Sequence, residues 1–196
     1  MSKVDTSTKT GKTKLSKEDA QMRLERMRKS VRGPFNRFLS FIIQGLVASI
    51  GVFVLRVMNK TSVYGQKILK HEQPPYLYVS NHLTMVDDFL LDPVLFGSIA
   101  ILRMKLKYFP WHVPEEKNFF LNPALTWFLR KCQAIPITRG RGVFQPGMTR
   151  VKELLLEDRI IHIYPEGTRS RNGDIGDGKI GVGKLAHETK IKVVPV

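Results

Sequence analysis

The spacing of apolar positions along the chain predicts strands that alternate with helices. Residues 76–80 and 159–164 are short runs rich in aromatic and β-branched residues, and each run ends in a polar turn. Residues 191–196 form a similar run. Residues 132–142 predict a strand that ends in a glycine-rich basic turn, although Pro136 argues against a central ladder position without a bulge.

Helical spacing is clearest over residues 146–158, where four apolar residues fall on one stripe: Met148, Val151, Leu154 and Leu155. Residues 88–96, 123–132 and 183–189 are also expected to be helical. We expect a linker over residues 65–75, and a strand pair, or a strand and a turn, over residues 98–108. Strands and helices in alternation indicate an α/β fold with a largely parallel sheet flanked by helices.

The N-terminal part of the chain has a different composition. Residues 1–18 are mainly Ser, Thr and Lys, which predicts disorder, and residues 17–37 are basic and predict a solvated helix or flank. We therefore expect three parts: a basic tail over residues 1–37, an apolar helix over residues 38–58 and a catalytic domain over residues 59–196.

The apolar segment has 18 residues without a charge, from position 38 to 55, which is the short limit for crossing a bilayer. Gln44, Ser49 and two glycines weaken the case for a simple span. A helix lying partly in one leaflet, with arginines at its ends near phosphates, is equally compatible. A buried core helix fits less well, because such helices rarely follow a long basic segment.

Composition narrows the classes of partner and site. The single cysteine, Cys132, excludes an internal disulfide and a cysteine-based zinc site, and no metal site or cofactor is expected. A net charge of +15 indicates a polyanionic partner, either anionic lipid or nucleic acid. The apolar segment favours lipid. Few aromatic residues accompany the basic tail, so nucleic acid is not expected to be a partner.

Two polar residues that follow the first predicted strand, His82 and Asp87, are candidates for acid–base catalysis. His82 and Asp87 are five residues apart, which places them roughly 140° apart on one continuous helix. They can meet only if a turn separates them and Asp87 lies in the first turn of the next helix. Asp87 would then fix one imidazole nitrogen, and the other nitrogen could take a proton from a hydroxyl. Alternatively, Thr84 and Asp87 form only a helix cap.

Three strand ends carry polar residues, at positions 82–87, 138–141 and 166–171. The carboxyl ends of parallel strands share one edge of a sheet, so these residues are expected to converge. Arg139 and Arg169 would supply planar guanidinium groups suited to a phosphate, while Gly140 and Gly167 would let backbone N–H groups approach an anion. Glu166 would order the arginines or accept from a substrate hydroxyl.

Four motifs in order resemble those of the glycerolipid acyltransferase superfamily: residues 81–87, 137–140, 164–170 and 193–196. Within that group the similarity is closest to the tafazzin family. It includes the doubled Asp87–Asp88, residues 139–148 and residues 161–167. The expected site therefore has His82 and Asp87 as the catalytic pair, with six substrate-binding residues: Asn81, Arg139, Gly140, Glu166, Gly167 and Arg169.

The resemblance implies a glycerol-3-phosphate acyltransferase-like fold and transfer of fatty acyl groups between phospholipids and lysophospholipids, without coenzyme A. His82 would deprotonate the lysolipid hydroxyl, and Glu166 with Gly167 would help bind the glycerophosphate portion. The family remodels cardiolipin and lies monotopically on mitochondrial membranes that face the intermembrane space. The endoplasmic reticulum membrane is the alternative location.

Two alternatives to this activity stay open. Residues 168–170, Thr-Arg-Ser, follow the broader superfamily form, which acyl-CoA-dependent lysophospholipid or 1-acylglycerol-3-phosphate acyltransferases share. A non-catalytic, basic membrane-binding protein is the alternative from another class. The chain also stops at the fourth motif, whereas the family continues beyond it, so the domain over residues 59–196 is expected to be incomplete.

Overall fold

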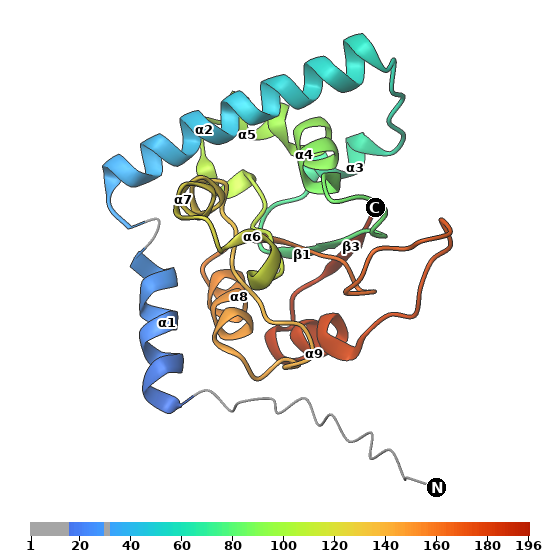
Figure 1. Cartoon of the computed structure of the whole chain (residues 1–196). Coiled ribbons are helices and arrows are strands. Elements are labelled where there is room, and N and C mark those ends of the chain that lie inside the picture. Colours follow the sequence, from blue (N-terminus) through green and yellow to red (C-terminus); the bar gives the residue numbers. More distant parts are fainter. Residues whose placement is uncertain (1–15, 30–31) are drawn as a thin grey trace, which may run out of the picture.

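A parallel sheet forms the centre of the protein, as seen in the computed structural model, which describes residues 16–29 and 32–196. Its strands, in the spatial order β2-β1-β3, are β1 (Tyr76–Val79), β2 (Ile160–Ile163) and β3 (Val193–Pro195) (Figure 1). The predicted α/β class with a parallel sheet is confirmed. The disorder predicted for residues 1–18 falls outside the described residues, except that Lys17 and Glu18 begin a helix.

Two extended segments continue the sheet beyond β2 through isolated parallel bridges. Trp111 pairs with Ile161, and the segment that starts at Trp111 pairs in turn with residues 134–137. The continuous strand predicted over residues 132–142 is therefore wrong. Pro136 has no N–H to donate, and the pairing is reduced to two separate bridges, at Ala134 and Ile137.

Helices cover both faces of the sheet. Their bounds are α1 (Lys17–Lys29), α2 (Pro34–Phe53), η1 (Val54–Met58), α3 (Gln66–His71), α4 (Asp87–Asp92), η2 (Pro93–Gly97), α5 (Ser98–Leu102), η3 (Leu106–Tyr108), α6 (Glu116–Phe119), α7 (Pro123–Lys131), α8 (Pro146–Leu156) and α9 (Ile180–Thr189).

Two further predictions of local structure are wrong. Residues 98–108, expected as a strand pair, are helical in α5 and η3, because α4, η2 and α5 form one uninterrupted helical run that buries Phe96, Ile99 and Ala100. The expected linker over residues 65–75 contains α3, whose Leu69 is buried against β1.

Alternation along the strands sorts the core into two layers. Leu77 and Ile161 point toward α8 and α9, where they pack with Leu154, Leu155 and Leu185. Tyr76, Tyr78 and Ile160 point to the other face and pack with η2 and α3. His162 shares this second face, because it follows Ile161 on β2. Figure 1 shows α2 lying across the side of the molecule opposite to α8 and α9.

The basic helix α1 is docked on the domain rather than fully solvated. Its Leu24 and Met27 are buried in the core layer that includes α8. Arg28 forms an ion pair with Glu153 of α8, and Arg23 forms one with Glu116 at 2.9 Å. Both ion pairs are partly exposed and so contribute little to stability individually. The buried apolar residues therefore hold this helix in place.

Helix α2 has its small and polar residues inside and its large apolar residues outside. The buried stripe consists of Ser40, Gln44, Ala48 and Gly51. The exposed side carries large apolar residues: Phe35, Phe38, Ile42, Leu46, Ile50 and Phe53. By length and composition, Pro34–Met58 is the one helix in the described ranges that could cross a membrane.

Close packing of α2 on η2 gives a test of this arrangement. A Cβ at Gly51 would lie 2.5 Å from Cγ of Pro93, whereas a Cβ at Gly45 on the same helix would meet nothing within 4 Å. We expect Gly51→Ala to destabilise the protein by about 1–3 kcal/mol through overpacking. Gly45→Ala should instead stabilise it by roughly 0.5–1 kcal/mol through helix propensity. Thermal unfolding of both variants in the same detergent measures the difference, and equal shifts would contradict the packing.

Candidate active site

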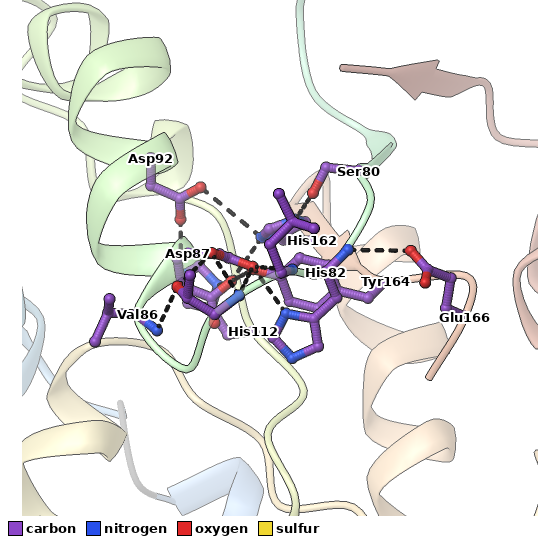
Figure 2. Close-up of polar contacts among 12 residues, drawn as sticks. Ser80, His82, Val86, Asp87, Asp92, His112, His162, Tyr164 and Glu166 are labelled. Atoms are coloured by element: carbon purple, nitrogen blue, oxygen red, sulfur yellow. Dashed lines mark hydrogen bonds and ion pairs between the residues drawn. The ribbon is translucent and has the colours of Figure 1, made fainter. Parts of the chain in front are cut away.

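His82 and Asp87 are in contact, as the spacing required. His82 lies in the turn after β1, Asp87 is the first residue of α4, and the imidazole Nδ1 is 2.9 Å from Oδ2 of Asp87 (Figure 2). The His82 ring also stacks on the Tyr164 ring at 3.9 Å between centroids. One nitrogen and one ring face are thus fixed by neighbours. The opposite nitrogen, Nε2, is left to act on a substrate.

Asp87 both orients the histidine and caps its own helix, so the two interpretations of its spacing coexist. Its carboxylate accepts hydrogen bonds from the backbone N–H groups of Leu83 and Thr84 and from the Thr84 hydroxyl. Burial alone would raise its pKa, but these bonds and the contact with His82 outweigh burial and lower the pKa of Asp87. The carboxylate is therefore ionised at neutral pH and favours a proton on Nδ1.

The turn after β2 holds the peptide groups of His82 from both sides. Oε1 of Glu166 accepts from the His82 N–H at 3.1 Å, and the Ser170 N–H donates to the His82 carbonyl at 2.7 Å. Oε2 of Glu166 accepts from the Gly176 N–H. Glu166 is 6% exposed. Its carboxylate is engaged by backbone groups and contacts neither arginine, contrary to one of its expected roles.

A cavity of about 190 Å³ adjoins the pair. Four of the expected site residues line it: His82, Arg139, Gly167 and Arg169. The strand ends after β1, after β2 and after residues 134–137 therefore converge, as predicted. Asn81, Gly140 and Glu166 are not among the lining residues, and Asn81 and Gly140 are exposed. Much of the wall is apolar, including Met85, Phe89, Phe109 and Phe119.

Arg139 is positioned at this cavity by a buried carboxylate. Its Nε lies 2.9 Å from Oε2 of Glu115, which is 8% exposed, while the arginine side chain itself is 48% exposed. The Arg139 backbone N–H also donates to Glu115. Glu115 thus holds the Nε of Arg139, and a guanidinium that is about half exposed at this cavity is suited to bind an anion.

A second group of histidines and carboxylates lies behind the first and was not predicted. Nδ1 of His162 is 2.9 Å from Oδ1 of Asp88, and Nε2 of His112 is 2.9 Å from Oδ2 of Asp92. The Tyr164 hydroxyl donates to Asp88. These residues connect to the first pair through the ring of Tyr164, which stacks on His82.

The carboxylates and imidazoles of this second group shift one another's pKa values. Burial disfavours ionisation of Asp88, but His112 and His162 outweigh it and hold the pKa of Asp88 well below its usual range. Burial likewise opposes the charge on His112, yet Asp88 and Asp92 raise the pKa of His112 to about 10. Burial and the charge of Asp88 raise the pKa of Tyr164, so its hydroxyl remains a donor.

Part of this second group had a signal in the sequence. Asp88 and Asp92 are four residues apart, which places both carboxylates on one face of a helix. His162 lies two residues before Tyr164, where the motif at residues 164–170 begins. His112 had no signal, because it lies in a segment, residues 111–120, whose structure the pattern does not predict.

The arrangement can perform general-base chemistry on a hydroxyl at the end of an apolar cavity. His82 would accept the proton through Nε2, and Asp87 would stabilise the imidazolium that forms. Arg139 and Arg169 place positive charge at the same cavity, where a phosphate could bind. These roles are proposals that follow from the geometry.

Comparison with known proteins agrees with this chemistry. The family model described as Acyltransferase matches residues 60–196. The chain is 32% identical to Taffazin of Dictyostelium discoideum, over 83% of this chain and 59% of that protein. It is 30% identical to N-acylphosphatidylethanolamine synthase of Arabidopsis thaliana, over 62% of this chain and 44% of that protein.

Identity is 27% to the chloroplastic 1-acyl-sn-glycerol-3-phosphate acyltransferase LPAT1 of Arabidopsis thaliana, over 83% of this chain and 42% of that protein. The chain thus spans about half the length of the curated relatives it matches. Since the family model covers more than half of the chain and includes His82, Asp87 and both cavity arginines, the protein belongs to the Acyltransferase family of glycerolipid enzymes.

Proposed function

We propose that this protein transfers fatty acyl groups between phospholipids and lysophospholipids at a membrane surface, without coenzyme A. The observation that carries the proposal is the His82–Asp87 pair at a cavity whose wall includes residues of α2. Gln44, Val47 and Ala48 of α2 line this cavity. The cavity that holds His82 therefore lies against the inward side of the helix whose outward side would contact lipid.

The outward face of α2 supports attachment to one leaflet. Phe38, Leu46, Ile50 and Phe53 are each more than half exposed, which is unusual for a monomeric soluble domain. The inward face packs along much of its length against η2, α4 and α7. A helix held against the domain in this way is better placed to lie in the membrane plane than to cross it.

In the proposed reaction, Nε2 of His82 takes the proton from the lysophospholipid hydroxyl, and the oxygen attacks the ester carbonyl of the donor phospholipid. The tetrahedral intermediate breaks its bond to the donor's glycerol oxygen, which takes the proton back from His82. One ester forms and one breaks, so no other reactant is needed. Arg139 and Arg169 would hold the phosphates of the two lipids.

A taffazin among the relatives favours this donor, and so does the doubled Asp87–Asp88, which resembles the tafazzin family. As the resemblance implies, the product would be remodelled cardiolipin in a mitochondrial membrane facing the intermembrane space. The relatives with 1-acylglycerol-3-phosphate acyltransferase names favour acyl-CoA as the donor instead. The decisive assay therefore compares phospholipid with acyl-CoA as the acyl donor.

We expect labelled phosphatidylcholine to transfer its acyl group to a lysophospholipid when both are mixed with the protein in the absence of acyl-CoA. Label appearing in the newly formed phospholipid, measured by thin-layer chromatography, checks the result. A parallel reaction supplies acyl-CoA in place of the phospholipid donor. Transfer only in that second reaction would exclude the transacylase and leave the acyl-CoA-dependent activity.

Removal of the catalytic base should abolish transfer while leaving the fold intact. We expect His82→Ala to lower the rate by about 10²–10⁴-fold, the usual contribution of a positioned general base. Asp87→Asn should also lower it, since an amide cannot favour the same tautomer. His187→Ala, at an exposed position on α9, is the control. Unchanged activity of a folded His82→Ala variant would support the non-catalytic membrane-binding protein.

Charges placed on the outer face of α2 should release the protein from lipid. We expect Leu46→Glu with Ile50→Glu to weaken binding to vesicles that contain anionic lipid by roughly 100-fold or more, because each buried apolar side chain contributes about 1.5–3 kcal/mol. Flotation in a density gradient measures the bound fraction. Leu156→Glu, at an exposed apolar position on α8, is the matched control. Equal flotation of both variants would place the contact elsewhere.

A further inference from the structure

Three side chains behind the catalytic pair converge on one point: Asp88 and His112, which are partly buried, and His162, which is buried. Oδ1 of Asp88 lies 2.9 Å from Nδ1 of His162 and 3.5 Å from Nδ1 of His112. All three atoms lie within 4.8 Å of one another. Each comes from a different segment: α4, the extended segment at residues 111–115, and β2. The three residues also line the cavity that His82 lines.

The other nitrogen of each imidazole is held by a neighbour. Nε2 of His162 lies 2.9 Å from Oγ of Ser80, and Nε2 of His112 lies 2.9 Å from Oδ2 of Asp92. With a proton on each Nε2, the Nδ1 lone pairs face the Asp88 carboxylate. Histidines that bind metals use this same support, in which a hydroxyl, carbonyl or carboxylate fixes the tautomer.

Hydrogen bonding alone leaves the inner nitrogens unexplained. The His162 side chain is completely buried, and among the described residues neither its Nδ1 nor that of His112 makes a hydrogen bond of acceptable geometry. Each Nδ1 lies within ion-pairing distance of the same Asp88 oxygen, and a cation shared by the three atoms would give both nitrogens a further partner. Asp88 Oδ1 is also the acceptor for the Tyr164 hydroxyl.

We propose that Asp88, His112 and His162 bind a divalent transition metal of the zinc class through Oδ1 and the two Nδ1 atoms. A tetrahedral ion with ligands at about 2.0–2.2 Å separates its ligand atoms by roughly 3.3–3.6 Å. The 3.5 Å between Asp88 and His112 falls in this range, and the 2.9 Å between Asp88 and His162 would have to widen slightly. Two imidazoles with one carboxylate suit zinc, cobalt or iron rather than the oxygen-bound magnesium or calcium. A proton on His112 is the competitor that the metal must displace.

Metal binding at this site does not depend on which acyl donor the protein uses. Tyr164 links the two sites, because its hydroxyl contacts Asp88 and its ring stacks on His82. A bound ion would therefore lie beside the cavity without replacing His82 or Asp87. Its binding can be measured directly, apart from any activity.

The test uses the full chain, stripped with a chelator and then loaded with Zn²⁺ or Co²⁺. We expect one metal per chain by elemental analysis after gel filtration, and a rise in Tm of roughly 5 °C or more with Zn²⁺. The Co²⁺ form should show the visible absorption of a tetrahedral site with nitrogen and oxygen ligands. A folded chain that retains no metal and shows no shift in Tm would overturn the proposal.

Substitutions of the proposed ligands and of Asp92 test whether the metal binds at this site. His112→Gln and His162→Asn should each abolish the Co²⁺ absorption, and Asp92→Asn should weaken Zn²⁺ affinity by about 10–100-fold, since it only supports His112. His187→Gln, with an exposed histidine on α9, should bind metal like the natural chain. If circular dichroism shows that His162→Asn does not fold, metal binding by His112→Gln and Asp92→Asn decides whether the site exists. Metal binding that persists unchanged in these two variants would also overturn the proposal.

Discussion

The site depends on the hydrogen bonds that fix the peptide groups of His82 between two strand ends. The turn after β2 accepts from the N–H of His82 through Glu166 and donates to its carbonyl through Ser170. Because β1 and β2 are parallel neighbours in register, both turns leave the sheet at the same edge. The backbone register places Tyr78 opposite His162 and Val79 opposite Ile163. This register alone brings the turn that carries His82 beside the turn that carries Glu166.

A second constraint joins this edge of the sheet to the surface. Helix α2 turns its small and polar residues inward, and Gly51 lets it approach Pro93 of η2 closely. η2 continues α4, which begins with Asp87. Helix α2 is therefore packed against the helical run that begins with Asp87, the residue that orients His82. An interior of small residues and an exterior of large ones is the reverse of a soluble amphipathic helix, and it suits a helix whose solvent is lipid.

The sequence pattern predicts several of the elements that position the site, but not all of them. Alternation over β1 and β2 and the spacing of α8 predicted those elements because each has one strong period. The run of α4, η2 and α5 was missed in part, since its buried apolar residues are interrupted by Pro93 and followed by basic positions. The pattern predicts a role toward substrate for Glu166, but it does not show that the carboxylate also accepts from the backbone N–H groups of His82 and Gly176.

The adjacent carboxylates Asp87 and Asp88 show why the sequence pattern does not predict the complete second histidine group. Successive residues on a helix are about 100° apart, so two neighbours must face different partners. Asp87 faces back to the turn and bonds to His82. Asp88 instead accepts a hydrogen bond from Tyr164 and lies 2.9 Å from Nδ1 of His162. His112 joins them only because the segment at residues 111–115 pairs beside β2. That pairing is a long-range property of the sheet, and no local spacing encodes it.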